Sequence, residues 1–248
     1  LAIDLGKEAK TDPEAVVTLV LDGVDITCTV APAVIFYNVY ECDEAWVAYD
    51  DGETEAYEAT STHDLSGAGA HVIIADGTVN NVNGAYVARI YKDTDEQKKL
   101  HKYDGAFYSR KSMLIEGQEA GTGILNINAA NEGLDSELHL DVNGGNINIS
   151  SADDGINTNE DGVSCTTING GVLHIVAGLG AEGDGIDSNG YLTINGGVVI
   201  SIANPRSDSG LDSDMGSVIN GGYVVATGST MDWPETDSDQ VTINLQFS

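Results

Sequence analysis

Carboxylates that return at a fixed spacing are the residues of this chain best suited to do chemistry. The phrase Gly-Ile-Asp-Ser at 185–188 recurs as Gly-Leu-Asp-Ser at 210–213, and earlier versions begin at Gly133 and Gly155. The third place of the phrase, and the place three residues before it, are mostly acidic: Asp135, Asn157, Asp187 and Asp212, and Glu132, Asp154, Asp184 and Ser209. If equivalent places stack about 4.8 Å apart, as parallel strands do, their like charges repel. Protons, amide partners or bound cations must then compensate.

The chemistry that this pattern favours is the binding of a hard cation. Carboxylate, amide and backbone carbonyl oxygens in glycine-rich turns are the ligands that Ca²⁺ prefers. The candidate metal ligands are Asp135, Asp154, Asn157, Asp184, Asp187 and Asp212. The alternative is a set of solvated acidic turns that bind no ion. No cluster of histidine and cysteine in the sequence indicates a softer metal.

A repeat must position these residues. The asparagine of an Asn-Gly-Gly phrase falls at 143, 169, 195 and 220, so the period is 26, 26 and 25 residues. A fixed period of this size indicates a solenoid, and each period contains three short strand-like segments and three turns. We therefore predict an all-β fold, a three-sided parallel β-helix with about 25 residues per coil. We expect a single domain over 1–248, with a loop insertion at 41–70 and an irregular C-terminal cap at 229–248 in which 241–247 is a last strand.

Each repeated place has a predicted environment. Two apolar sets should face the core: Leu134, Ile156, Ile186 and Leu211, and Val142, Ile168, Ile194 and Ile219. The asparagines of the Asn-Gly-Gly phrases should form a ladder of side-chain amides, and the first glycine of each pair should adopt a left-handed backbone at a corner. Before the repeat, residues 46–49 are a candidate strand, and residues 92–102 are predicted to be a solvated surface excursion.

The net charge and the cysteines limit the classes of partner. The 40 acidic residues against 10 basic ones give a formal charge of −30 at pH 7, which argues against nucleic acid and anionic membranes. No apolar run approaches the roughly 20 residues that a membrane helix needs, so membrane insertion is not expected. Cys28 and Cys42 are either a disulfide or two buried thiols. Cys165 is expected to be a core thiol, since no paired histidine is evident near it.

Several phrases resemble one known family. They are VTLVLDGVDIT at 17–27, HVIIADGTVNNVNG at 71–84, DGAFYSRKSMLIEG at 104–117, and the repeated Gly-Ile-Asp-Ser and Ile-Asn-Gly-Gly. In these phrases the chain is similar to a bacterial secreted carbohydrate-binding domain, a right-handed parallel β-helix that is pectate-lyase-like in fold and binds cellulose and acidic sugars. The resemblance covers most of the chain except 41–70 and the tail. It implies Ca²⁺ and an extracellular or cell-surface setting.

Catalysis has little support in the residues. β-Elimination from a uronate needs a base, commonly arginine or lysine, and Ca²⁺ to acidify the proton that is removed. After Lys111 the chain contains a single arginine or lysine, Arg206. The simpler role for Arg206 is a surface ion pair with Asp208 or another nearby acid.

The leading hypothesis is a non-catalytic, extracellular carbohydrate-binding module that is stabilised by Ca²⁺. Its partner would be a polysaccharide of the cellulose or polygalacturonate class. The candidate ligand-binding residues are Arg206, Tyr223, Trp46 and Trp233, because sugars bind to aromatic faces and planar polar groups. The alternatives are a Ca²⁺-dependent polysaccharide lyase with Arg206 as its base, and a cell-surface adhesin or structural spacer.

Overall fold

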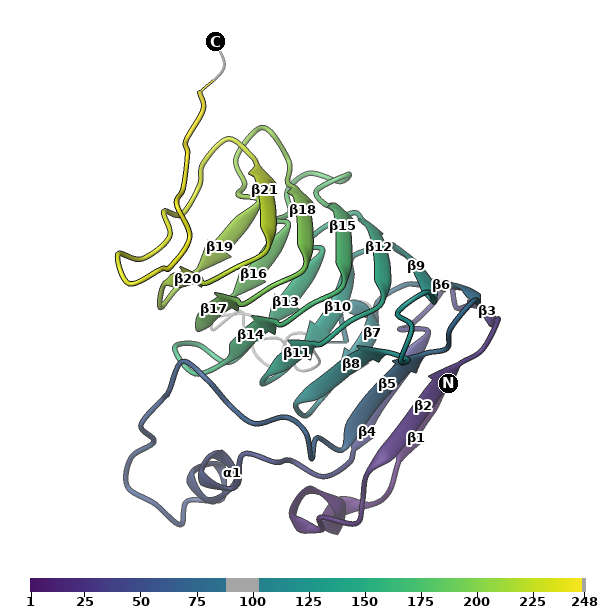
Figure 1. Ribbon diagram of the computed structural model, residues 1–248. Helices are drawn as coiled ribbons and strands as arrows, with labels where there is room; N and C mark the ends of the chain where they lie inside the picture. Colours follow the sequence, from purple (N-terminus) through teal and green to yellow (C-terminus); the bar gives the residue numbers. More distant parts are fainter. Residues whose placement is uncertain (88–102, 247–248) are drawn as a thin grey trace.

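Three parallel sheets make up the described part of the chain. The computed structural model describes residues 1–87 and 103–246, and in them successive strands enter three different sheets in turn (Figure 1). Each sheet contains seven strands, and neighbouring strands pair parallel. This arrangement confirms the predicted all-β class and the three-sided parallel β-helix.

The strands of each sheet follow one another at intervals of three in chain order. Sheet A contains β1 (Ala2–Asp4), β4 (Val34–Asn38), β7 (Gly105–Ser109), β10 (Glu132–Ser136), β13 (Ile156–Thr158), β16 (Ile186–Ser188) and β19 (Leu211–Ser213). Sheet B contains β2 (Val17–Leu21), β5 (Ala70–Ile74), β8 (Met113–Gly117), β11 (Leu140–Val142), β14 (Cys165–Ile168), β17 (Tyr191–Ile194) and β20 (Ser217–Ile219). Sheet C contains β3 (Asp25–Thr27), β6 (Val79–Gly84), β9 (Ile124–Ala129), β12 (Asn146–Ser151), β15 (Val172–Val176), β18 (Val198–Ile202) and β21 (Tyr223–Thr227).

The inside of the coils is a continuous apolar core. The two predicted apolar columns pair residue on residue in sheets A and B, and every member is buried: Leu134, Ile156, Ile186 and Leu211, and Val142, Ile168, Ile194 and Ile219. Inward residues of sheet C, among them Leu125, Ile149 and Ile175, belong to the same buried cluster. Each coil therefore buries its apolar side chains against the coils above and below it.

The corner after each repeated sheet B strand requires a glycine, but it is the second glycine of the pair. The left-handed residues are Gly145, Gly171, Gly197 and Gly222, with φ of 90°, 89°, 85° and 86°. The prediction for the first glycine is therefore wrong. A Cβ at Gly171 would also lie 2.7 Å from the carbonyl oxygen of Gly145. Backbone conformation and close approach both exclude a side chain there.

The predicted asparagine ladder is present. The Asn169 side-chain amide donates to the Asn143 side-chain oxygen at 2.8 Å, and Asn195 and Asn220 extend the chain with the same distance. A second ladder, not predicted, runs along sheet C, where Asn126 donates to Asn81 at 3.0 Å and Asn148 donates to Asn126 at 2.9 Å. Each ladder satisfies amide groups of one coil with those of the next.

We expect the position of an asparagine in the ladder to determine its contribution to stability. Asn195 makes two ladder hydrogen bonds, whereas Asn220 makes one. At about 1 kcal/mol for each bond, Asn195→Ala should lower the free energy of unfolding by about 2 kcal/mol and Asn220→Ala by about 1 kcal/mol. Urea unfolding of the two variants measures the difference. Equal losses would show that the ladder bonds do not add up in this way.

The segment between β4 and β5 departs from the prediction. Residues 46–49 belong to helix α1 (Glu44–Asp50), so the candidate strand there is wrong. Asp43 caps the helix by accepting a hydrogen bond from the Trp46 N–H at 3.0 Å, and the Trp46 ring packs against Tyr49 with a centroid distance of 5.4 Å. Residues three apart share a face of a helix but not of a strand, so this contact needs the helix. Neither α1 nor any other helix in the described residues is long and apolar enough to cross a membrane.

The C-terminal residues follow the edge of the last coil without forming a strand. Between 231 and 240 they hydrogen-bond to β19 and β20, and the Glu235 N–H, for example, donates to the Ser217 carbonyl at 2.7 Å. The predicted strand at 241–247 is absent over 241–246, where Val241 is 91% exposed. Residue 247 and the predicted excursion at 92–102 lie outside the described residues.

Cys28 and Cys42 are free thiols in the structure. Of the two alternatives, the disulfide is therefore absent. Cys28 packs against the core of the coils, whereas Cys42 packs against a separate cluster that includes Leu65 and Leu114. Burial, followed by the charge of Glu41, raises the pKa of the Cys42 thiol to about 12. Both side chains contribute to packing rather than to a covalent link.

Candidate functional site

The predicted acidic columns stack along sheet A. On β10, β13, β16 and β19, Asp135 pairs with Asn157, Asn157 with Asp187, and Asp187 with Asp212. We call the two columns together the acidic seam, and its members are Glu132, Asp135, Asp154, Asn157, Asp184, Asp187, Ser209 and Asp212. The strands that carry it are successive neighbours in the sheet (Figure 1). The seam therefore extends over four consecutive coils.

The seam carboxylates are held by backbone N–H groups. The Asp184 N–H donates to Asp154 Oδ1 at 2.7 Å, and the Ser209 N–H donates to Asp184 Oδ1 at 2.5 Å. Asp135 Oδ2 accepts from the Gly105 N–H at 3.1 Å, and its Oδ1 accepts from the Asn159 side-chain amide at 2.6 Å. Adjacent coils thus fix where these carboxylates lie.

A column of glycines lies between the two acidic columns and allows the coils to approach closely. It consists of Gly133, Gly155, Gly185 and Gly210, and a Cβ at any of them would come within 3.0 Å of another heavy atom. At Gly155 the Cβ would lie 2.2 Å from Ile175 Cγ2 and 2.5 Å from the Gly185 carbonyl oxygen. The glycine of the repeated Gly-Ile-Asp-Ser phrase is therefore required by space. Parallel strand pairing places the acids of adjacent coils in register beside this column.

Burial and mutual repulsion raise the pKa values of the seam acids. Burial, then the charges of Asp153 and Asp187, raises the pKa of Asp154 to about 8. Burial, then the charges of Asp184 and Asp212, raises the pKa of Asp187 to about 7. Without a cation, protonated and ionised forms of these groups are both populated near neutral pH.

The first coil of the seam is the most deeply buried. Burial, followed by the charges of Asp135 and Asp154, raises the pKa of Glu132 well above its ordinary value. Burial, followed by Glu137 and Asp104, does the same to Asp135. At the other end, burial and the hydrogen-bonded neighbour Asp232 raise the pKa of Asp212 to about 6. Burial and neighbouring acids therefore oppose complete ionisation of the carboxyl groups along the whole seam.

We expect the metal-free protein to lose stability as pH rises from about 4 to about 8. In this window native Asp154 and Asp187 retain protons that the unfolded chain, with an ordinary pKa near 3.8, has released. Stability from such groups is complete below the unfolded pKa and is lost as pH rises through the folded pKa. One proton retained over two pH units corresponds to about 2.7 kcal/mol of unfolding free energy.

The measurement is urea unfolding in chelator at about pH 5 and about pH 7, for the unmodified protein and for Asp154→Asn. The comparison with the variant is needed because burial lowers the pKa of His63 to about 4, which gives the opposite pH dependence in both proteins. The Asp154→Asn protein should lose less stability over the interval. An identical pH dependence of the two proteins would contradict the assignment to Asp154.

The residues of the seam fit a hard cation. Within the described residues, Glu132 Oε2 and Asn157 Oδ1 are buried and lack a hydrogen-bond donor, and the two residues are 5% and 8% exposed. None of the ion pairs between described residues involves a seam carboxylate. Oxygen atoms without donors, in a setting where carboxylates repel, form the kind of ligand set that Ca²⁺ prefers.

The four candidate ligand-binding residues do not all lie in one part of the molecule. Arg206 is exposed in the turn after β18, and among the described residues it forms no ion pair with Asp208. Tyr223, 63% exposed, begins β21 of the last coil, and Trp233, 62% exposed, lies in the C-terminal segment. Trp46 is on α1 beside the N-terminal coils (Figure 1), half-buried against other aromatic rings. The structure does not gather Trp46 and Tyr223 into one site.

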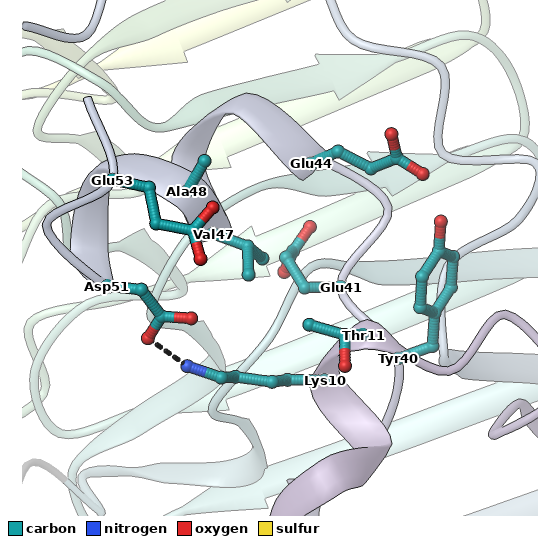
Figure 2. A pocket seen from close by; sticks show the side chains of 9 residues that line it. All are labelled: Lys10, Thr11, Tyr40, Glu41, Glu44, Val47, Ala48, Asp51 and Glu53. Carbon is teal, nitrogen blue, oxygen red and sulfur yellow. Dashed lines mark hydrogen bonds and ion pairs between the residues drawn. The ribbon is translucent and has the colours of Figure 1, made fainter.

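A pocket of about 200 Å³ lies where α1 meets the short 3₁₀-helix η1 (Lys7–Thr11), and the sequence did not predict it (Figure 2). Its polar lining is mostly acidic, and its one lysine, Lys10, pairs with Asp51. Glu41 is buried there and accepts hydrogen bonds from the Ser112 N–H and hydroxyl, both at 2.8 Å. The pocket is therefore a junction that holds residues 41–69 against the coils. Its acidic lining is unsuited to an acidic sugar.

Sequence reasoning also missed the surroundings of Cys165. Its side chain lies beside His63 and His139, and the possible ligand atoms of all three are within 4.8 Å of one another. The expectations that no histidine is paired with Cys165 and that there is no histidine–cysteine cluster are therefore wrong. The three residues are widely separated in the sequence and share no motif, so no local signal could have revealed the cluster.

One comparison with known proteins identifies a family. A family model described as "Carbohydrate-binding domain-containing protein" matches residues 65–244, a range that includes the whole acidic seam. No curated protein and no solved structure gives a significant match to the chain. The matched range is well over half of the 248 residues. The chain belongs to the family of carbohydrate-binding domain-containing proteins, and its partner is a carbohydrate.

Proposed function

We propose that this protein is a non-catalytic module that binds acidic polysaccharide of the polygalacturonate class through Ca²⁺ held by the acidic seam. The observation that carries the proposal is the seam itself, in which the acids of four coils stack. Two of its buried oxygens, Glu132 Oε2 and Asn157 Oδ1, accept no hydrogen bond from a described residue. The acidic groups recur once in each coil. Such a row suits a polymer better than a small molecule, since solenoids bind along extended surfaces. The setting that we propose is extracellular, in line with the resemblance of the repeat phrases.

Two parts of the seam would hold cations. In the first part Glu132, Asp154 and Asn157 contribute oxygens from adjacent coils, and two of these oxygens are buried without a donor. In the second part Asp184, Asp187 and the more exposed Asp212 lie on the following coils. When bound, Ca²⁺ would replace the protons that these acids otherwise retain and would offer its remaining coordination positions to sugar oxygens.

The charge of the protein explains why a cation matters for an acidic ligand. The formal charge is −30 at pH 7, so a polyuronate chain meets repulsion at long range and at contact. Bound Ca²⁺ reverses the sign of the local interaction. A neutral glucan would need no such bridge and could instead lie on the outer face of sheet C, where Tyr223 and Val172 are exposed in one column.

Affinity electrophoresis tests the proposal. We expect polygalacturonate in the gel to retard the protein when Ca²⁺ is present, and chelator or the double variant Asp154→Asn, Asp187→Asn to abolish the retardation. The matched control is Glu119→Gln, which removes an exposed acid outside the seam. If cellulose or xylan retards the protein equally with and without chelator, Ca²⁺ bridging is overturned. Lack of retardation by every glycan would favour a spacer.

The non-catalytic character is tested separately. A lyase would need a base near its Ca²⁺, and Arg206 is the one arginine or lysine after Lys111. We expect no rise in the ultraviolet absorbance of unsaturated product when the protein is incubated with polygalacturonate and Ca²⁺. A rise that disappears in Arg206→Ala would overturn this part of the proposal and assign a lyase.

A further inference from the structure

A buried cluster of nitrogen and sulfur ligands lies where residues 41–69 contact the coils. His139 belongs to the corner between β10 and β11, Cys165 begins β14, and His63 comes from the irregular part of the segment after α1. His139 and Cys165 are buried and His63 is half-buried. The cluster is separate from the acidic seam, and His63 precedes the range that matches the family model.

Two hydrogen bonds fix the tautomer and the orientation of the His139 ring. Its Nδ1 accepts the Cys165 backbone N–H at 3.1 Å, so Nε2 carries the proton and faces Asp43 Oδ2 at 3.3 Å. A carboxylate that accepts the N–H of one ring nitrogen fixes the tautomer and makes the other nitrogen a better ligand. The lone pair of Nδ1 is directed at the Cys165 backbone N–H, so a metal ion at Nδ1 must displace this hydrogen bond.

Asp43 is itself held firmly in this role. It accepts hydrogen bonds from the Tyr57 hydroxyl at 2.5 Å and the Trp46 N–H at 3.0 Å. Burial works to raise its pKa, but the hydrogen bonds from His139, Tyr57 and Trp46 outweigh burial and hold the pKa of Asp43 well below its usual range. Asp43 therefore remains a charged acceptor for the His139 N–H.

The other two candidate ligands, His63 and Cys165, differ in whether they must lose a proton before they bind a metal ion. Burial and the neighbouring His139 lower the pKa of His63 to about 4, so the ring is neutral and retains a lone pair at neutral pH. Burial, then Asp141, raises the pKa of the Cys165 thiol to about 12. Its Sγ donates to the Thr60 carbonyl at 3.1 Å. A bound metal must displace this proton, as metals do when they bind a thiol.

Binding of a metal ion requires a rearrangement at all three ligands. In a tetrahedral Zn²⁺ site the ligand atoms are about 3.3 Å apart for two nitrogens and about 3.6 Å apart for nitrogen and sulfur. The three candidate atoms lie within 4.8 Å of one another, so each needs a modest inward shift. The rings of His63 and His139 are stacked, with centroids 3.8 Å and planes 18° apart. His63 must therefore tilt out of the stack, and it lies in a stretch without helix or strand.

We propose that His63, His139 and Cys165 bind a transition-metal ion of the Zn²⁺ class, with Asp43 as a positioning residue for His139. Two imidazoles and a thiolate select such ions over Ca²⁺, which prefers oxygen. Three protein ligands leave the fourth position of a tetrahedral ion to water. The ion links the segment that carries His63 to two adjacent coils, and this role does not depend on which carbohydrate the protein binds.

Cobalt titration tests the site, because Co²⁺ occupies zinc sites and a thiolate ligand gives it a near-ultraviolet charge-transfer band. We expect the full chain to bind one equivalent of Co²⁺ with this band, and Zn²⁺ to displace it. Cys165→Ser should abolish the band, and Asp43→Asn should weaken binding about 10–100-fold while the band persists. The matched control is Cys42→Ser, whose thiol packs in another cluster and should leave the band unchanged.

Carboxylates of the seam could also bind Co²⁺, but an oxygen-only site gives no thiolate band, so the two sites are distinguished. Far-ultraviolet circular dichroism in chelator confirms that each variant folds, and the Ca²⁺ response of Cys165→Ser should match that of the unmodified protein. Absence of the band at excess Co²⁺, or its persistence in Cys165→Ser, would overturn the proposal.

Discussion

Alanine at Gly155 should lower the free energy of unfolding by about 3 kcal/mol or more, and it should prevent folding if the coils cannot separate locally. The added Cβ would lie 2.2 Å from Ile175 Cγ2 and 2.5 Å from the Gly185 carbonyl oxygen. The carbonyl belongs to the next coil, so the contact cannot be relieved by a rotamer change alone. Guanidinium unfolding followed by circular dichroism measures the loss.

The matched control is Gly67→Ala. Gly67 has open space where a Cβ would lie and no left-handed backbone, so the change should stay within about 0.5 kcal/mol. The loss at Gly155 should recur at Gly133, Gly185 and Gly210, which occupy the same place in their coils. If Gly155→Ala and Gly67→Ala unfold at the same denaturant concentration, close approach of the coils is not what requires the glycine.

Removal of Ca²⁺ should lower the melting temperature by roughly 5–10 °C at neutral pH. A ligand present at about 100 times its dissociation constant adds about 2.7 kcal/mol of stability, and each kcal/mol shifts the midpoint of a chain of this size by about 2–4 °C. The physical reason is the seam, where burial and neighbouring charges raise the pKa of Asp154 to about 8 in the absence of a cation. Thermal unfolding with Ca²⁺ and with chelator measures the shift.

Asp154→Asn gives a result of opposite sign in the two conditions. In chelator the variant should be as stable as the unmodified protein or more stable, because an amide removes repulsion and still offers Oδ1 to the Asp184 N–H. With Ca²⁺ it should lose most of the gain in melting temperature. Glu119→Gln, outside the seam, should keep that gain. If the unmodified protein has the same melting temperature with Ca²⁺ and with chelator, Ca²⁺ binding by the seam is contradicted.

The glycine column and the acidic columns beside it belong to the same repeated phrase. The glycine column allows the coils to pack without a steric clash, and parallel strand pairing places the acids on either side of it in register from coil to coil. A solvated row of acids farther apart would not need a cation. Close packing and the proposed metal affinity therefore both depend on residues of the phrase Gly-Ile-Asp-Ser.

Much of the fold follows from the period. A strand pattern that repeats every 25 or 26 residues leaves parallel stacking as the way to bury each coil, so residues such as Ile156, Asn169 and Asp187 could be assigned to a core column, a ladder and the seam. The choice between the two glycines of each pair could not be made in this way. It depends on which peptide turns at the corner, and the structure gives the left-handed conformation to Gly171 and its equivalents.

Tertiary structure alone decided what happens outside the repeat. Residues 44–50 are helical because Asp43 caps them and Trp46 packs on Tyr49 and Tyr57, contacts that no period encodes. The cluster of His63, His139 and Cys165 forms because residues 41–69 fold back onto a corner of the coils. The sequence by itself determined which residues stack in the apolar columns, in the ladder of the Asn-Gly-Gly phrases and in the acidic seam, since neighbouring coils repeat the same geometry. Contacts between a single excursion and the coils occur once, so only the three-dimensional path of the chain decided them.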